Sequence, residues 1–511
     1  MRKTSFLILF VLIVCVFCFA NFSLVWAKKD SLIMGLENAV KDLDYYRDGT
    51  RVNLITAYQI YDPLVKRDPN TGVLHPNLAL SWKTINDTTW EFKLRPGIKF
   101  HNGNPLTAEC IRYTMDDRIL LPEKKAHLRP QFNWVEKVEV IDDLTFRILT
   151  KKPYPLVLEK LSSFFPYDPI WCEKMGDQYV STHAMGTGPY KFVEFDRDNH
   201  LVLVANENYW QKGLPKIKNL TFRFIPELST RLAELLSGGV DVIRKVKPDQ
   251  IAIIDKNPNL KLVEVPILRV FYWQFDASGR ASKSPLMDAQ VRRAFWHAID
   301  RETIIKTVLD GRVDLLNIPM NPKQFGADLS IQGWKYDPKL AKDTLEAAGY
   351  GQGFTVECSV YDGTFLSVCE AAAGYLQKVG INLKIKSYVG NVGQMVKIHK
   401  AGKLEGIYAG SFGSYNVFDA DAILPWHFNS EVSQTAYVKD TELAGWLTEA
   451  RSILDPARRI ELYAKAQKRI VEKAYWLPWY INHDLQGVNK KLKYVVGVDE
   501  VPRLEQAEWT D

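Results

Sequence analysis

The sequence contains little cysteine, no basic run and no low-complexity segment. Six cysteines in 511 residues are too few for a small disulfide-built scaffold. No stretch of five to eight residues is rich in Lys and Arg, so nucleic acid is not an expected partner. With 46% hydrophobic and 25% charged residues the composition is that of a folded chain. At roughly 100 to 200 residues per domain, this length predicts two to four structural units.

Aromatic residues, in contrast, are abundant. The chain has 14 Trp, 23 Tyr and 24 Phe. Such side chains line ligand clefts, and they also fill ordinary cores. Composition alone leaves both interpretations open.

The only long apolar run lies at the start of the sequence. Arg2 and Lys3 precede the run from Phe6 to Ala20, and small residues lead to Ala27. This pattern is typical of a secretory signal peptide, so we expect residues 1–27 to be removed. An uncleaved membrane anchor is the alternative, because the segment is about long enough to cross a bilayer.

Lipid attachment is a third interpretation of the same segment. Cys15 follows Val14 and Cys18 follows Phe17, whereas a lipoprotein signal places a small residue there. We therefore expect a protein exported from the cytoplasm, in the periplasm or another extracytoplasmic compartment.

Four cysteines remain in the mature chain: Cys110, Cys172, Cys358 and Cys369. They allow three complete pairings, and the last two, which lie closest together, either form a disulfide or stay as buried thiols. None has the Cys-x-x-Cys spacing of a zinc or redox site. No metal and no cofactor is predicted.

Short strand patterns alternate with helical patterns along the mature chain. Strands are predicted at 31–35, 89–94, 98–100, 135–141, 145–149, 190–195, 201–205, 220–225, 270–275, 355–360 and 382–388. Helices are predicted near 107–119, 156–161, 228–237, 288–299, 301–309, 338–348, 366–379 and 456–471. This mixture favours layered α/β or α+β architecture.

Nine segments, in order, carry a resemblance to a known family. They read IYDPLVKRD (60–68), LHPNLALSW (74–82), TWEFKLRPGIKFHNGNPLTAE (89–109), GTGPYKF (186–192), NENYWQKGLPKI (206–217), LLSGGVDV (235–242), VRRAFWHAIDRETII (291–305), YDPKLAKDTLEAAGY (336–350) and LQKVGINLKI (376–385). The chain resembles the extracytoplasmic solute-binding proteins of ABC transporters, in the peptide and nickel class called family five.

The resemblance implies a two-lobed α/β periplasmic binding protein fold, class II-like, with an extra α+β subdomain inserted in the first lobe. Lobe I would comprise residues 28–70, 183–271 and 485–511, with the subdomain at 71–182. Lobe II would comprise 272–484. The lobes would close on a ligand because only the closed form lets both contact it.

The resemblance also places a first group of ligand contacts. In relatives the loop after the first strand lines the cleft, and here it reads YYRDGTRVN (45–53), which contributes Tyr46, Arg51 and Asn53. The Arg51 guanidinium suits a carboxylate, which it can bind through two hydrogen bonds; a solvated surface arginine is the alternative.

A second group lies on the predicted strand at 270–275. Alternation puts Tyr272 and Gln274 on one face and Trp273 on the other. We expect one of these faces to line the cleft.

A third group lies in FGSYNVFDADAILPWHF (412–428). Peptide-binding relatives carry an acidic residue there for the peptide amino group, where this chain has Ser414 or Tyr415; Asp419 or Asp421 would replace it if the loop is longer. Trp426 and His427 are further candidates. His427 could contact a nickel complex, but a lone histidine beside a tryptophan is more often a structural residue. Relatives that bind dipeptides also carry an Arg before the helix leading into LQKVGINLKI, whereas YDGTFLS (361–367) has none.

The predicted function is therefore capture of a small organic solute, a short peptide or peptide-like compound, and its delivery to ABC permease subunits in the inner membrane. A monomer is expected. A nickel or metallophore carrier is the alternative on the same fold. A secreted hydrolase is a third reading, although no Gly-x-Ser-x-Gly or His-Glu-x-x-His motif is present, so no enzyme is predicted.

Overall fold

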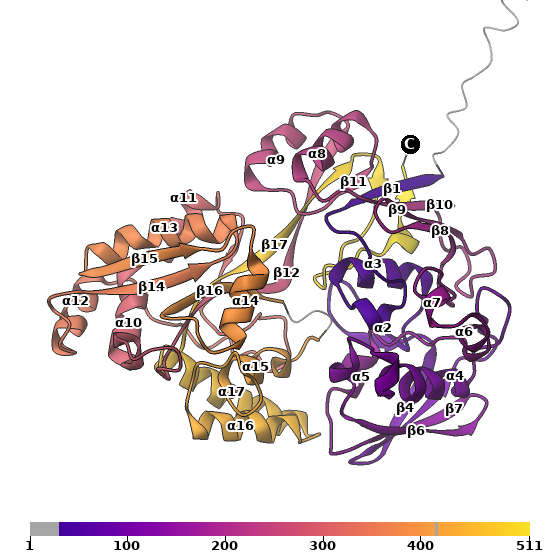
Figure 1. The fold of residues 1–511 in the computed structure, drawn as a ribbon, viewed down its shortest axis with the longest axis horizontal. Coiled ribbons are helices and arrows are strands. Elements are labelled where there is room, and N and C mark those ends of the chain that lie inside the picture. Colours follow the sequence, from indigo (N-terminus) through magenta and orange to yellow (C-terminus); the bar gives the residue numbers. More distant parts are fainter. Residues whose placement is uncertain (1–29, 414–416, 511) are drawn as a thin grey trace, which may run out of the picture.

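The computed structural model describes residues 30–413 and 417–510. The predicted leader and the candidates Ser414 and Tyr415 lie outside the described residues. The described chain forms two lobes (Figure 1). Its two ends meet in the first lobe, where the Trp509 indole N–H donates to the Ser31 carbonyl at 3.0 Å.

One large sheet runs through both lobes. Within the described residues it has 11 strands in the order β15-β14-β16-β12-β17-β11-β1-β10-β9-β8, with β13 beside β17. They are β1 (Ser31–Leu36), β8 (Tyr190–Asp196), β9 (His200–Ala205), β10 (Asn219–Phe224), β11 (Val242–Ile243), β12 (Leu260–Phe275), β13 (Asp314–Leu315), β14 (Phe354–Val360), β15 (Ile381–Ser387), β16 (Ile407–Phe412) and β17 (Trp476–Asn489).

Two long antiparallel strands, β12 and β17, connect the lobes. In the first lobe β17 also pairs with β11, and in the second lobe β12 also pairs with β16. Their ladder shifts register between Pro266 and Val270, where proline supplies no backbone donor. The predicted lobe boundaries at 271/272 and 484/485 fall within these strands and stay predictions.

The first lobe contains eight helices and, besides its part of the large sheet, three small sheets among the described residues. Its helices are α2 (Tyr45–Asp48), α3 (Arg51–Ile60), α4 (Ala108–Arg112, continued by a π-helical turn at Tyr113–Leu120), α5 (Val157–Leu161), α6 (Pro169–Met175), α7 (Asp177–Val180), α8 (Leu228–Ser237) and α9 (Pro248–Asp255). Its smaller sheets are β4-β5-β7-β6 (Ala79–Asn86, Thr89–Leu94, Thr145–Thr150, Val135–Asp142), β2-β3 (Val65–Arg67, Leu74–Pro76) and β18-β19 (Leu492–Lys493, Glu508–Trp509).

The second lobe encloses its part of the large sheet between helices. These are α10 (Ala289–Ala298), α11 (Arg301–Val308), α12 (Pro338–Ala347), α13 (Gly363–Gln377), α14 (Val392–Lys400), α15 (Leu424–Phe428), α16 (Thr441–Arg451) and α17 (Pro456–Glu472). Short 3₁₀ turns lie at Pro122–Lys124, Arg129–Gln131, Pro285–Met287, Ala420–Ala422 and Leu504–Gln506.

Most predicted elements occur, but the loop predicted at 45–53 is helical, in α2 and the start of α3. Several elements were not predicted, among them β4, β16 and α16. Three further differences concern strands. The predicted strand 98–100 is only an isolated bridge between Lys99 and Pro105. The strand predicted from Val270 begins ten residues earlier, at Leu260. The strand β17 was not predicted, because Pro478 and the polar residues after it break the apolar pattern, although its partners on both sides keep it extended.

The glycines of GTGPY serve close packing rather than anion binding. A Cβ atom on Gly186 would lie 2.0 Å from the Ile60 carbonyl oxygen. The Gly188 N–H donates to the same carbonyl at 2.9 Å. This backbone donor is therefore committed to the core and unavailable to a phosphate.

The four described cysteines are buried free thiols. The Sγ atoms of Cys358 and Cys369 are 3.9 Å apart, so these residues are neighbours without a disulfide.

Candidate functional site

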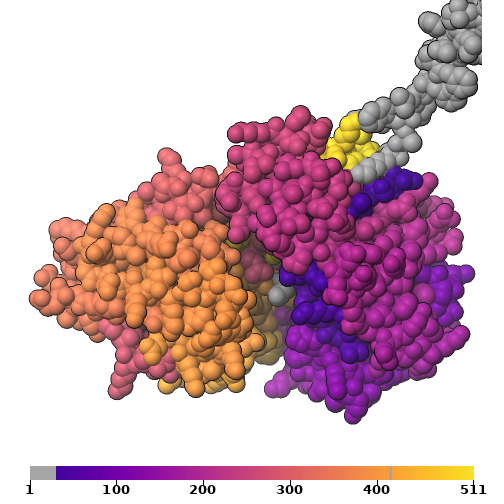
Figure 2. Space-filling view, turned by 45° about the horizontal axis from the view of Figure 1, so that its top comes forward, coloured from indigo at the N-terminus to yellow at the C-terminus, as the bar shows by residue number. Residues whose placement is uncertain are grey.

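A cavity of about 450 Å³ lies between the lobes, beside the two connecting strands. The space-filling view shows the furrow that separates the lobes (Figure 2). The lining residues include Glu37, Arg51, Lys245, Lys247, Arg269, Arg312, Tyr361, Asp362, Thr364, Phe365, Ser411, Tyr480, Asn482, His483, Asp484 and Glu500. Both lobes and both connecting strands thus contribute to it.

Cations dominate the side formed by the first lobe. Arg51 is the first residue of α3, where Thr50 caps the helix by accepting from the Asn53 N–H at 3.3 Å. Lys245 and Lys247 belong to the segment between β11 and α9, and Arg269 lies on β12. Their convergence gives this side of the cavity several groups that can bind a carboxylate.

Glu500, from the C-terminal segment, already neutralises part of this positive charge. Its carboxylate lies 3.3 Å from Lys245 Nζ, 3.7 Å from Arg269 Nε, and 3.8 Å from Arg51 Nε and Arg244 Nη2. Burial opposes ionisation, but the attraction of Lys245, Arg51, Arg269 and Arg244 holds the pKa of Glu500 well below its ordinary value. Glu500 is therefore negatively charged at neutral pH.

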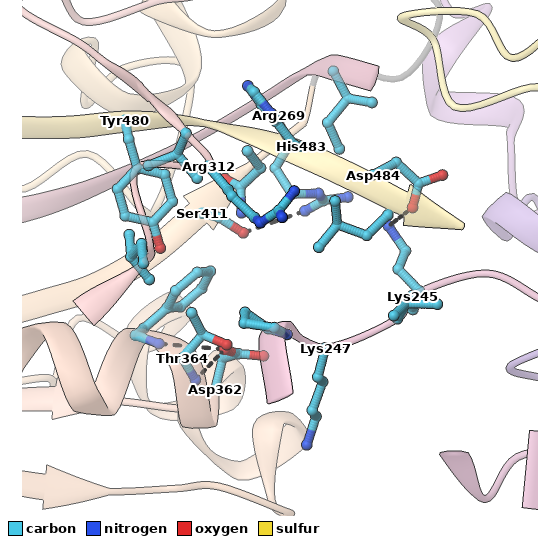
Figure 3. Close-up of a pocket in the computed structure, with 18 of the residues that line it drawn as sticks. Lys245, Lys247, Arg269, Arg312, Asp362, Thr364, Ser411, Tyr480, His483 and Asp484 are labelled. Carbon is cyan, nitrogen blue, oxygen red and sulfur yellow. Dashed lines mark hydrogen bonds and ion pairs between the residues drawn. The ribbon is translucent and has the colours of Figure 1, made fainter. Parts of the chain in front are cut away.

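The opposite side of the cavity presents an acidic residue and hydroxyl groups. Asp362 caps α13, accepting from the backbone N–H groups of Thr364 at 2.8 Å and Phe365 at 3.3 Å through Oδ1. Its other oxygen faces the open space, across from Arg269 and His483 (Figure 3). Within the described part of the chain Asp362 has no cation partner. It can therefore receive a ligand ammonium group.

Hydroxyl groups on the same side add neutral hydrogen-bonding capacity. The Tyr361 and Ser411 hydroxyls lie 3.1 Å apart, and Tyr361 also accepts from the Ser411 N–H at 3.2 Å. Tyr480, on β17, lines the cavity beside them. Such groups can orient a peptide backbone without adding charge.

The histidine at the cavity is held by carboxylates. His483 Nδ1 lies 2.7 Å from Glu264 Oε1, and Nε2 lies 3.2 Å from Asp314 Oδ2. Arg312 Nη1 lies 2.9 Å from the other oxygen of Glu264, Oε2, so this carboxylate contacts both side chains. Among the described residues no group of three or more His, Cys, Asp or Glu side chains is arranged to hold a metal ion.

Of the predicted contacts in the loop 45–53, only Arg51 reaches the cavity. Its side chain is 12% exposed and its Nη1 donates to the Asp499 carbonyl at 2.6 Å. Tyr46 is a core residue instead, since its hydroxyl donates to the Phe165 carbonyl at 2.9 Å and accepts from the Phe165 N–H at 2.8 Å. Asn53 is buried in α3, with its amide bonded to the Asp42 carbonyl at 2.7 Å.

The predicted cleft face on β12 is a buried face. Alternation is as expected, but helices of the second lobe cover both sides of the strand. Tyr272 stacks on Trp476 with ring centroids 3.5 Å apart, and Trp273 packs into the other core against Trp479. Gln274 donates to the Thr435 carbonyl at 2.9 Å and bonds His399 at 3.1 Å. None of the three lines the cavity.

The described candidates in 412–428 also lie elsewhere. Asp419 forms a buried two-point ion pair with Arg459 at 2.8 and 2.9 Å. Trp426 is 43% exposed on α15, away from the cavity lining. His427 is buried under Tyr272, and burial holds its pKa well below the ordinary value. A neutral, enclosed imidazole is consistent with a core role.

Sequence reasoning missed most of the lining. The contributing residues come from β12, β17, the segment before α9 and the C-terminal segment, none of which carries a recognisable motif. Asp362 lies in the segment 361–367, which stands out in the sequence only because it lacks the arginine of dipeptide-binding relatives. The available signal was the charge of residues outside the predicted helices and strands, which is too common a feature to single out a site.

Comparisons with known proteins place the chain in context. The family described as bacterial extracellular solute-binding proteins, family 5, matches residues 73–434. The glutathione-binding protein GsiB of Pectobacterium atrosepticum is 27% identical over 95% of this chain and 95% of its own. HbpA2 from Haemophilus parasuis superposes with a TM-score of 0.82 at 22% identity, covering 94% of this chain and 100% of its own.

A third comparison concerns a liganded structure. The dipeptide-binding protein from Pseudoalteromonas sp. SM9913, in complex with Met-Leu, gives a TM-score of 0.77 at 21% identity, covering 94% of this chain and 100% of its own. These neighbours confirm the predicted two-lobed α/β fold. No helix in the described part of the chain combines the length and apolarity needed to span a bilayer.

Proposed function

The chain belongs to the family 5 bacterial extracellular solute-binding proteins, and on that basis we propose that it is the substrate-binding component of an ABC importer for a short peptide or peptide-like solute. One observation carries the choice of ligand: the cavity between the lobes offers cations that can bind a carboxylate on one side, and on the other Asp362, which has no cation partner among residues 30–413 and 417–510. A peptide carries both complementary charges.

The geometry supports capture by closure. A ligand that contacts both sides of the cavity gains those interactions only when the lobes are together, so binding shifts the population toward the closed form. Water excluded on closure strengthens the charge-assisted hydrogen bonds. The protein would then present the closed form to permease subunits in the inner membrane, acting as a periplasmic monomer without catalysis.

The relatives give the ligands to test. GsiB is named for glutathione, and the Pseudoalteromonas protein holds a dipeptide. Each combines an ammonium group with at least one carboxylate: methionyl-leucine carries one carboxylate and glutathione carries two.

A thermal-shift panel tests the proposal. The purified protein is heated with glutathione, methionyl-leucine, free alanine or nickel–histidine. A peptide at about 100 times its dissociation constant stabilises the folded state by about 2.7 kcal/mol through mass action, which raises Tm. Stabilisation by nickel–histidine alone would favour the metallophore alternative, and turnover of a bound peptide, followed by mass spectrometry, would favour the hydrolase.

A further inference from the structure

Glu500 is one of three carboxylates, with Glu37 and Asp484, on the cationic side of the cavity. It lines the cavity together with three of its cation partners, Arg51, Lys245 and Arg269. These partners come from α3, the segment before α9 and β12. Glu500 contacts all three of these cations. The other two carboxylates on this side pair with fewer of them: Asp484 lies 3.3 Å from Lys245 Nζ and 3.6 Å from Arg244 Nη2, and Glu37 lies 2.9 Å from Arg244 Nη1.

The contacts of Glu500 differ from those of a simple structural ion pair. Its four cations lie at 3.3 to 3.8 Å. The neighbouring Asp499 pairs with Arg503 at 2.7 Å. Asp499 also anchors the segment to α3, because its carbonyl accepts from Arg51 at 2.6 Å. The C-terminal segment is therefore fastened without Glu500.

The backbone around Glu500 also indicates a role beyond packing. Glu500 and its partner Lys245 have φ values of 64° and 59°. This left-handed region is disfavoured for residues with a Cβ, and such conformations concentrate at ligand clamps and other functional sites. Both residues of one ion pair adopt it at the edge of the cavity.

We propose that Glu500 is a built-in carboxylate that sets the charge of the accepted ligand: it neutralises the cationic side so that the cavity favours ligands without surplus negative charge. This inference rests on the proposed peptide-binding function and deepens it. Without Glu500, the same cations would attract an additional ligand carboxylate more strongly. With it, each added carboxylate meets a fixed like charge a few ångströms away.

Two pairs of probes that differ by one carboxylate measure this selectivity. They are glutathione with its glycyl monoethyl ester, and methionyl-leucine with methionyl-leucinamide. Calorimetry gives the ratio of Kd for the acid to Kd for its capped partner, in the full chain. In Glu500→Gln this ratio is expected to fall at least about tenfold relative to the wild type, since a like charge is removed.

Three variants complete the experiment. Glu500→Asp keeps the charge and should keep the wild-type ratio. Glu500→Asn removes the charge with a residue that tolerates the left-handed region, so it replaces Glu500→Gln if that variant fails to fold. Glu505→Gln is the matched control, because Glu505 is a buried glutamate of the same segment, paired with Lys66 at 2.8 Å and outside the cavity lining. It should lower Tm without changing the ratio.

The outcomes separate this inference from the proposed function. If Glu500→Gln and Glu500→Asn change both Kd values of a pair by the same factor, Glu500 merely positions the site and the inference is wrong, while peptide binding stands. If the wild type binds no member of either pair, the proposed function fails and the inference fails with it.

Discussion

At the scale of single residues, ion pairs decide which charges a ligand meets. Arg51 lines the cavity, but it also contacts Glu500 and the Asp499 carbonyl. A ligand carboxylate would therefore bind an arginine that is already oriented, which reduces the conformational entropy lost on binding.

Removing this arginine should weaken the acidic member of each probe pair. Arg51→Ala is expected to raise the Kd of methionyl-leucine more than about tenfold, equivalent to about 1.4 kcal/mol, by calorimetry. Arg47→Ala is the control, because Arg47 lies in the neighbouring helix α2, pairs with Asp42 at 3.3 Å and stays outside the lining. Unchanged affinity in Arg51→Ala would remove Arg51 from the site.

Buried histidine gives a second residue-scale prediction, on pH. Burial lowers the pKa of His101 to about 4, although the Gly188 carbonyl, 3.0 Å from Nε2, favours a protonated nitrogen there. The unfolded chain takes up a proton near its ordinary pKa of about 6.5 while the folded chain does not. Stability contributed by neutral His101 is thus complete above about pH 6.5 and falls as pH decreases toward 4.

Urea unfolding of wild type and His101→Gln at pH 7.5 and pH 5 tests this linkage. Between pH 7.5 and pH 5 the free energy of unfolding of the wild type should fall by up to about 2 kcal/mol more than that of the variant. His75→Gln, at an exposed position, serves as the control. Parallel losses in wild type and His101→Gln would contradict the prediction.

At the scale of elements, the start of α13 combines a structural and a binding role. Asp362 caps the helix with one oxygen and faces the cavity with the other. Asparagine caps helices about as well as aspartate, so Asp362→Asn removes the charge while keeping the cap.

This variant should lose discrimination between free and blocked amino groups. The wild type is expected to prefer methionyl-leucine over its N-acetyl form, and Asp362→Asn to reduce that preference about tenfold, equivalent to about 1.4 kcal/mol. Asp337→Asn is matched, since Asp337 caps α12 by accepting from the Leu340 N–H at 2.9 Å, away from the cavity. An unchanged preference in Asp362→Asn would assign Asp362 to capping alone.

Elements were the most predictable level of the structure. Helices α8 and α17 followed from apolar periodicity and from clear ends, such as Gly238 in the left-handed conformation after α8. Strand β17 was missed because its extended conformation depends on pairing with β11, β12 and β13 rather than on its own composition. Local patterns carry no information about such partners.

At the scale of the whole molecule, a second contact joins the lobes away from the cavity. The N–H of Phe418, in the second lobe, donates to Glu159 Oε2 at 2.7 Å, and Arg67 Nη2 donates to the same oxygen at 2.6 Å. The Arg67 guanidinium lies over the Phe418 ring, 4.1 Å from its centroid. This contact favours the arrangement in which the lobes touch.

Shortening Phe418 should loosen that arrangement. Phe418→Ala is expected to increase the radius of gyration of the ligand-free protein in small-angle scattering. It should also raise the Kd of methionyl-leucine about tenfold, because the contact between the lobes then stabilises the closed form less. Leu329→Ala, at a side chain that is 64% exposed in the second lobe, is the control. If Phe418→Ala matches wild type in both measurements, the contact does not influence closure.

The sequence by itself determined many of the helices and strands, the two-lobed family and one cavity residue, Arg51, because periodicity, turn chemistry and motif order are local properties. Only the tertiary structure decided which charges meet. Arg51 and Asp499 are 448 residues apart in the chain, yet they touch. Burial likewise assigned Tyr272 and Trp273 to cores, since a strand alternates its side chains whether one face or both are covered. Which faces of a strand are covered depends on how distant segments pack against it, and a local sequence pattern does not contain this information.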